Sequence, residues 1–305
     1  MTVALGLSSG GVPPRSLTHV STRRRVKNLV MTLLMGLALV IVGGLLVLVL
    51  ITVVGKGIGI VFHDFPTWFT EDISASTRRQ GGGMRAAIVG TILITAAATA
   101  MAVPLGIGGA VYLNEYGRTN AFAKLLRFLT NVMTGVPSIV MGLFIFVSWV
   151  LLLGQKGISA FSGALALACL MLPIVVRSTE EMLKLVPQHL RDASYALGGT
   201  RSRTTMTVVL PSAAPGILSG CLLAIARAAG ETAPLIFTIG AARHMNLHLF
   251  RGTNTALSTQ IYANARTTFP VAQERAWGAA LTLIALSFAF MLLARVTSAR
   301  LGRTR

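Results

Sequence analysis

Residues 30–54 read VMTLLMGLALVIVGGLLVLVLITVV and contain no charged side chain. A helix needs roughly 20 apolar residues to cross a bilayer whose hydrocarbon core is about 30 Å thick. The run follows the basic segment 23–27, is too long for the core of a signal peptide, and precedes no A-x-A-like cleavage site. We therefore predict that it is retained as a first transmembrane helix.

The composition of the whole chain is that of a membrane protein. The 305 residues are 53% hydrophobic and only 12% charged, against roughly 25% charged residues in soluble domains. The net charge of +18 raises the question of nucleic acid as a partner. The basic residues fall between apolar runs, however, and form no stripe interleaved with aromatic residues. We therefore predict no nucleic-acid partner.

Six apolar runs come near the length of a membrane span. They cover residues 30–54, 86–111, 128–153, 158–176, 213–239 and 277–293. In lipid, an isolated segment can pair all of its backbone hydrogen-bonding groups only by forming a helix. The predicted fold is therefore all-α and crosses the membrane several times. The corresponding division is an N-terminal tail 1–29, a six-span domain 30–297 and a C-terminal tail 298–305.

The distribution of Lys and Arg predicts the orientation, because cytoplasmic loops retain basic residues. With the N-terminus inside, 17 of the 27 basic residues fall in inner segments and 9 in outer ones, while Arg227 lies within a span. Both termini are therefore predicted to be cytoplasmic. Two long outer loops, 55–85 and 240–275, carry polar and aromatic residues such as Trp68, and serve either as a surface for an external partner or as solvated connectors.

Glycine and proline mark two places where the spans depart from plain helices. Gly135 and Pro137 interrupt the third run, and since proline lacks an amide donor we predict a kink there. This kink is either a gate along a pathway or a static packing feature. The small residues Gly106, Gly108 and Gly109 predict close helix packing in the second run.

The inner loop 177–211 carries the most specific pattern. Its apolar residues are spaced as in short amphipathic helices, Gly198 and Gly199 predict a sharp turn, and Leu210-Pro211 predicts a stop before the chain re-enters the membrane. A short exposed helix–turn element is suited to docking in the groove of a partner.

The loop resembles the Glu-Ala-Ala loop of bacterial ABC importer permeases, whose pattern is E-A-A-x3-G-x9-I-x-L-P. Asp192, Ala193, Ser194, Gly198, Leu210 and Pro211 match it in spacing, with Asp for Glu, Ser for the second Ala and Val208 for Ile. The resemblance implies the MetI-like fold of type I importers. It also implies that these residues form a coupling loop that inserts into a separate ATPase subunit.

A narrower resemblance covers nearly the whole chain. Residues 134–144 (TGVPSIVMGLF), 177–182 (RSTEEM) and 226–235 (ARAAGETAPL) are similar to permeases of the phosphate-specific ABC importer. Within that system they are most similar to the PstA type of permease subunit, chiefly through Gly-Glu-Thr-Ala-Pro-Leu. The resemblance implies a subunit that forms half of a phosphate pathway.

The same resemblance implies the partners and the location. They are a PstC-like companion permease, a PstB-like ATPase dimer that binds ATP and Mg, and an external PstS-like phosphate-binding protein, all at a bacterial plasma (inner) membrane. No cofactor is expected in this chain, because no G-x-x-x-x-G-K-[ST] motif is present.

Charged residues within or beside the spans are the candidates for the pathway. Arg227 and Glu231 stand at i and i+4 in the fifth run, where they form either a structural ion pair or part of an anion path. Family resemblance points to Arg177 together with Arg227. Guanidinium groups suit phosphate because their planar fork offers paired hydrogen bonds.

Other functions receive less support from the sequence. No Ser-His-Asp or Cys-His set indicates an enzyme, His244 and His248 lack a third metal ligand, and two cysteines predict no disulfide framework. An ion-coupled secondary carrier would be driven through Arg227 and Glu231, but such carriers commonly have internal repeats, which are not evident. An importer of sulfate, molybdate or another solute remains an alternative, because the inner loop indicates coupling to an ATPase and carries no information on the transported solute.

Overall fold

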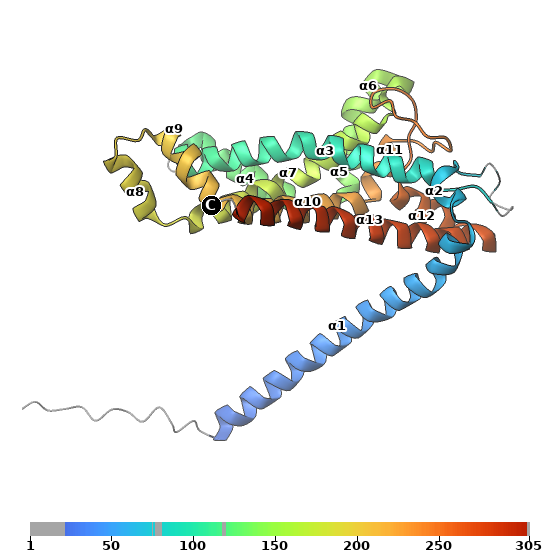
Figure 1. The fold of residues 1–305 in the computed structure, drawn as a ribbon, viewed down its shortest axis with the longest axis horizontal. Coiled ribbons are helices and arrows are strands. Elements are labelled where there is room, and N and C mark those ends of the chain that lie inside the picture. Colours follow the sequence, from blue (N-terminus) through green and yellow to red (C-terminus); the bar gives the residue numbers. More distant parts are fainter. Residues whose placement is uncertain (1–21, 75, 77–80, 118–119, 304–305) are drawn as a thin grey trace, which may run out of the picture. The chain divides into compact units, whose positions relative to one another are not determined.

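The computed structural model describes residues 22–74, 76, 81–117 and 120–303, and every regular element in these ranges is a helix (Figure 1). The elements in order are α1 (Thr22–His63), α2 (Thr67–Thr70), α3 (Arg85–Val111), η1 (Tyr112–Tyr116), α4 (Ala121–Gly135), α5 (Ser138–Ile145), η2 (Phe146–Val150), α6 (Leu151–Leu153), η3 (Gly154–Gly157), α7 (Ala160–Leu185), α8 (Gln188–Ala196), α9 (Arg201–Thr204), η4 (Thr205–Val209), α10 (Leu210–Gly230), α11 (Ala233–Thr238), α12 (Leu257–Ala265) and α13 (Pro270–Arg303).

Five of the six predicted spans correspond to helices long and apolar enough to cross a membrane, and the remaining one corresponds to a bent pair of helices. The five are α1, the run from α3 through η1, α7, the run from α9 to α10, and α13. The predicted third span is the pair of α4 with the run 138–153, bent by 109° at residues 136–137. The predicted kink at Gly135 and Pro137 is thus confirmed as a full break, because Val136 and Pro137 are extended and end the hydrogen-bonded ladder.

Several predicted bounds were wrong because polar residues can lie on helices as well as in loops. α1 extends past residue 54 to His63, and α7 extends past residue 176 to Leu185. The predicted fifth span ends as α10 at Gly230, and the chain resumes as α11 after a break at Glu231 and Thr232. The long loop 240–275 contains α12.

The chain forms two units, one up to Thr52 and one from Val53 onward. In the first, the apolar part of α1 is almost wholly exposed, and only 6% of its most apolar window is buried. A helix that is apolar on all sides is typical of a membrane span.

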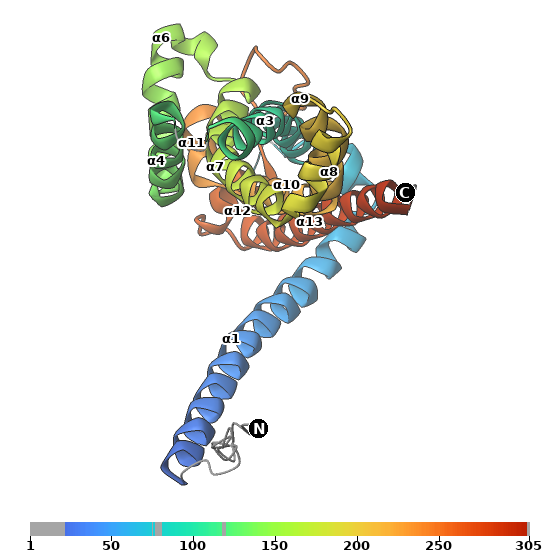
Figure 2. The same ribbon diagram turned by 90° about the vertical axis from the view of Figure 1, so that its left-hand side faces the viewer.

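The second unit is a bundle of α3, α7, α10 and α13, which Figure 2 shows nearly end-on. Alanine dominates its core, so the helices approach closely. The predicted role of Gly106 is confirmed, since a Cβ there would lie 2.6 Å from Val175 of α7. Gly109 makes only ordinary contact with α7 and Gly108 faces open space, so the prediction was wrong for Gly108.

The two ends of this bundle carry different short helices, after which they are named. The α8 end carries α8 and α9, and the α12 end carries α2, α12 and the loop that follows α11 (Figure 1). At the α12 end Trp68 is completely buried, and its indole N–H donates to Thr282 of α13 at 3.0 Å. Trp68, predicted to lie in an open loop, is therefore a core residue.

Candidate coupling element and intramembrane charges

The coupling element predicted within residues 177–211 consists of α8, a turn and α9. The chain leaves α7 at Leu185, and Pro187 precedes α8 with φ −62° and ψ 142°. Proline lacks an amide donor and disfavours helix before it, so α7 ends there and a new helix begins. Along α8 only Arg191 is buried, and the helix presents its other side chains outward or at half burial.

The turn between α8 and α9 depends on Gly198, whose φ is +81°. That left-handed conformation is one that residues with a Cβ rarely adopt. Leu197 just before it is 91% exposed. The turn is closed by the Ser194 hydroxyl, which lies 2.8 Å from the hydroxyl of Thr204 on the far side. The predicted sharp turn is confirmed at Gly198.

Asp192 and Ala193 lie on the exposed part of α8. The Asp192 carboxylate accepts a hydrogen bond from the Gln188 amide at 3.1 Å, one turn earlier on the same helix. The turn therefore presents Asp192, Ala193 and Gly198 away from the bundle, which is the arrangement that docking into a partner requires.

Leu210 and Pro211 do not stop the chain, and that prediction was wrong. Helix resumes at Arg201 and passes through η4 into α10 without a break. Pro211 lies in the first turn of α10, where a missing amide donor is tolerated, and the π-helical turn η4 precedes it. The predicted loop is therefore shorter than residues 177–211, since its two ends belong to helices.

Arg177, predicted in the loop, lies within α7 and pairs with Glu181 at 3.3 Å. Its side chain is 62% exposed. A cavity of about 230 Å³ beside it is shared with α4, where Arg127 pairs with Glu180 at 3.1 Å and donates to the Leu113 carbonyl at 2.8 Å. Arg177 therefore belongs to a mixed group of charges towards the α8 end of the bundle.

Arg227 and Glu231 form an ion pair at 3.6 Å, as one of the two interpretations predicted. They do not share a regular helical face, because Glu231 ends α10 in an extended conformation. The Glu231 carbonyl accepts a hydrogen bond from the Ser258 hydroxyl of α12 at 2.9 Å. The Glu231 side chain is 19% exposed and that of Arg227 69% exposed, so the cation is the more open partner.

Arg177 and Arg227 are not neighbours within this chain. Gly220 of α10 lies against Ser178 of α7, since a Cβ on Gly220 would overlap that side chain. Arg227 follows Gly220 towards the α12 end, by about 10 Å at 1.5 Å per residue. The two arginines thus lie at different levels of the bundle, and each has its own carboxylate partner, Glu181 for Arg177 and Glu231 for Arg227.

The comparisons with known proteins agree with this geometry. Residues 102–303 match the family described as the binding-protein-dependent transport system inner membrane component. The phosphate transport system permease protein PstA of Mycobacterium leprae is 44% identical over 271 residues, which are 88% of this chain and 88% of that protein. This chain belongs to the PstA family of permeases.

Further relatives of this PstA-family chain carry the same name. The phosphate transport system permease protein PstA 1 of Mycobacterium tuberculosis (strain CDC 1551 / Oshkosh) is 43% identical, with 90% of this chain and 89% of that protein covered. The PstA of Yersinia pestis is 40% identical, with 76% and 77% covered. A solved chain of the MetNI methionine ABC transporter in inward-facing form has a TM-score of 0.55 at 18% identity, covering 72% of this chain and 94% of that one. This likeness confirms the MetI-like fold.

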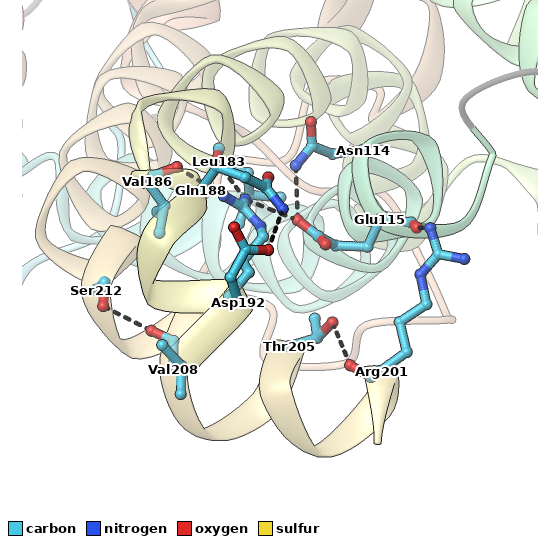
Figure 3. A network of polar contacts seen from close by, with 11 residues as sticks. Asn114, Glu115, Leu183, Val186, Gln188, Asp192, Arg201, Thr205, Val208 and Ser212 are labelled. Atoms are coloured by element: carbon cyan, nitrogen blue, oxygen red, sulfur yellow. Dashed lines mark hydrogen bonds and ion pairs between the residues drawn. The ribbon is translucent and has the colours of Figure 1, made fainter. Parts of the chain in front are cut away.

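The ion pair of Arg191 with Glu115 was missed by sequence reasoning. Arg191 of α8 contacts the Glu115 carboxylate of η1 at 3.0 Å, and the two side chains are only 5% and 4% exposed. The Asn114 amide also donates to Glu115, at 2.8 Å, as Figure 3 shows. Arg191 precedes the Glu-Ala-Ala-like motif directly, but no local pattern connects it with a residue near the end of another span.

A second polar group lies at the α12 end of this PstA-family permease. Asp72 pairs with Arg85 at 3.1 Å and lies 3.4 Å from the His244 ring, so it connects the segment before α3 with the loop after α11. Partial burial raises the pKa of Asp72, but hydrogen bonds from the Met245 backbone, Arg85 and His244 and the Arg85 charge together leave it below its ordinary value.

His244 and His248 do not converge. His244 is turned to Asp72, and the backbone amide of His248 donates to the side chain of Asn246. Within the described ranges, no three His, Cys, Asp or Glu side chains gather as a metal site needs.

Proposed function

We propose that this chain is the permease subunit of an ATP-driven importer of inorganic phosphate and forms half of its translocation pathway. The observation that carries the proposal is the similarity to relatives named PstA over most of both chains. The exposed helix–turn element around Gly198 is the feature through which such a subunit would receive the movement of an ATPase.

The subunit would work in a complex and bind no nucleotide itself. A PstC-like permease would complete the pathway, and a PstB-like ATPase dimer, which binds ATP and Mg, would dock on the α8 end. A PstS-like protein would deliver phosphate at the α12 end. In this arrangement the protein would lie in the bacterial inner membrane with both termini in the cytoplasm, which the excess of basic residues in the predicted inner segments favours.

The anion path would use the two exposed arginines in succession. Arg227 lies towards the α12 end beside the break after α10, and Arg177 lies towards the α8 end. Each has one carboxylate partner and more than half of its side chain exposed, so part of its guanidinium group stays accessible. A guanidinium that keeps free donors can exchange a carboxylate for phosphate oxygens at little cost. The break at residues 136–137 would act as the gate.

Uptake of radiolabelled phosphate into proteoliposomes tests the proposal. The four kinds of subunit are reconstituted together, with or without internal ATP, and sulfate is added as competitor. Uptake that requires ATP and resists sulfate is expected. Uptake driven by an ion gradient without ATP would replace the proposal with a secondary carrier. ATP-driven uptake of sulfate or another solute would keep the importer and replace its cargo.

A further inference from the structure

We propose that the buried ion pair of Arg191 with Glu115 is a rigid joint through which α8 moves α3 and α7, so that Arg191 is a positioning residue for coupling ATP hydrolysis to transport. The proposal rests on the proposed function, since it takes the turn at Gly198 as the ATPase contact. It assigns a role to two residues outside the Glu-Ala-Ala-like motif.

Arg191 makes most of the polar side-chain contacts between α8 and the bundle. It is the only buried residue of α8, while its neighbours Asp192 and Tyr195 are exposed. Apart from the Ser194 hydroxyl contact with Thr204, the described polar side-chain contacts from α8 to another element are those of Arg191. A force applied to the exposed face of α8 therefore reaches the bundle through this side chain as well as through the backbone on either side of α8.

The Arg191 guanidinium contacts two span ends at once. One terminal nitrogen donates to the Val186 carbonyl at 2.6 Å, and the other donates to the Leu183 carbonyl at 3.0 Å and contacts Glu115. Leu183 lies in the last turn of α7, where carbonyls lack helical partners and the helix dipole favours a cation. Glu115 lies in η1, the π-helical extension of α3. The two span ends are thereby joined to α8.

Glu115 also receives the second half of the coupling element. The Arg201 guanidinium of α9 donates to the Glu115 backbone carbonyl. The carboxylate thus contacts α8 and the carbonyl contacts α9, so both sides of the Gly198 turn converge on one residue (Figure 3). A movement of the whole turn would displace Glu115 and with it the end of α3.

The burial of the pair makes the joint stiff. In a medium of low effective dielectric, separation of the charges leaves each one desolvated and uncompensated, so the two groups tend to move together. A buried ion pair is nevertheless a weak source of stability relative to apolar side chains of similar volume. Replacement of both partners, in Glu115→Gln/Arg191→Met, is therefore expected to preserve folding, whereas a single replacement leaves one buried charge unpaired. The double variant allows coupling to be measured separately from assembly.

The experiment compares phosphate delivered per ATP hydrolysed by the reconstituted complete importer, normalised to the amount of assembled complex. Arg191→Met and Glu115→Gln should keep ATP hydrolysis while phosphate delivered per ATP falls about tenfold, within the usual range of coupling between sites. Arg191→Lys should give an intermediate ratio, because a point charge can keep the contact with Glu115 but not the fork to both carbonyls. In the double variant Glu115→Gln/Arg191→Met, phosphate delivered per ATP should fall no further than in Arg191→Met, because both changes remove the same interaction.

The matched control is Arg295→Met in α13, an exposed arginine with no side-chain partner among the described residues. Its ratio should equal that of the wild type. A wild-type ratio for Arg191→Met overturns the joint, whether hydrolysis is normal or reduced together with transport. Lack of any ATP-driven transport by the wild type overturns the proposed function, and the joint with it. If the wild type carries another solute, the same ratio is measured on that solute.

Discussion

Glu231 is held in place by its backbone and carries a charge at the break after α10. Its carbonyl is held by Ser258 of α12, and its carboxylate contacts Arg227 beside the break after α10. An ionised carboxylate here would accept a hydrogen bond from a protonated phosphate oxygen and repel sulfate, which carries no such proton. Backbone anchoring fixes where that negative charge lies.

Replacement of Glu231 by Gln is expected to relax discrimination between phosphate and sulfate by about tenfold, the size of one hydrogen bond to a charged group. Uptake of labelled phosphate against a series of sulfate concentrations measures it. Glu274→Gln, an exposed carboxylate in the first turns of α13, is the control. Retained transport with unchanged selectivity would remove Glu231 from the recognition of phosphate.

Asp72 is a second charged residue of the α12 end, where its contacts with Arg85 and His244 connect two segments of the chain. Its pKa is lower in the folded protein than in the unfolded chain. Its contribution to stability is therefore present above the unfolded pKa of about 3.9 and is lost as the pH falls through the folded value. The Ile73 amide next to it donates to the Arg243 carbonyl at 3.0 Å and reports on this junction.

We expect Asp72→Asn to increase hydrogen exchange at Ile73 and residues 243–245 at neutral pH. The difference from the wild type should vanish at a pH below the folded pKa of Asp72, where the wild-type carboxyl is also neutral. Hydrogen exchange followed by mass spectrometry measures both. Glu71→Gln, at an exposed neighbour, serves as control. A difference that persists in acid would show that charge is not the cause.

At the scale of elements, the α8–turn–α9 unit depends on one left-handed glycine. Nothing lies within 4 Å of a Cβ built on Gly198, so any effect of a side chain there comes from φ and not from a clash. The left-handed conformation costs a residue with a Cβ roughly 1–2 kcal/mol. The turn would therefore shift while the bundle stays intact.

Gly198→Ala is expected to weaken binding of the ATPase subunit by about tenfold, since 1.4 kcal/mol corresponds to a factor of ten. Titration of the purified ATPase onto the permease pair, read by fluorescence anisotropy, measures it. Gly108→Ala is the matched control, because Gly108 is helical and also faces open space. Equal affinity of the two variants for the ATPase would show that the turn at Gly198 is not part of the ATPase contact.

At the scale of the whole molecule, the second unit has two chemically different ends. The α8 end presents α8 and α9, and the α12 end has a cavity of about 580 Å³ whose lining includes Thr259, Gln260 and Arg266. If both termini lie in the cytoplasm, as predicted, the α8 end also faces the cytoplasm.

A cysteine at Ser202 of α9 should react with a membrane-impermeant maleimide only from the cytoplasmic side, and one at Arg251 only from the outer side. The labelling is done on intact and on inverted membrane vesicles after Cys169 and Cys221 have been replaced by alanine. Both positions are exposed, so accessibility and not burial decides the outcome. The reverse pattern would refute the predicted orientation.

The sequence by itself determined which segments are long and apolar enough to cross a membrane, the break at Pro137 and the turn at Gly198. Each depends on local physical chemistry: apolar length against bilayer thickness, a missing amide donor, and a missing Cβ. The importer family was predicted from the resemblance of the motif around Asp192, and the PstA type from the resemblance of residues 226–235. Helix ends were predicted less well, since charged residues such as Arg177 continue a helix whenever their side chains reach solvent or a partner.

The tertiary structure decided which distant residues meet. Glu115 and Arg191 are separated by 76 positions, and Trp68 and Thr282 by 214, so no periodicity connects them. The separation of Arg177 from Arg227 follows from the register of α7 against α10, which close approach at Gly220 sets. A sequence pattern determines what each segment does on its own, whereas packing between helices determines which charges are paired and which stay open to a ligand.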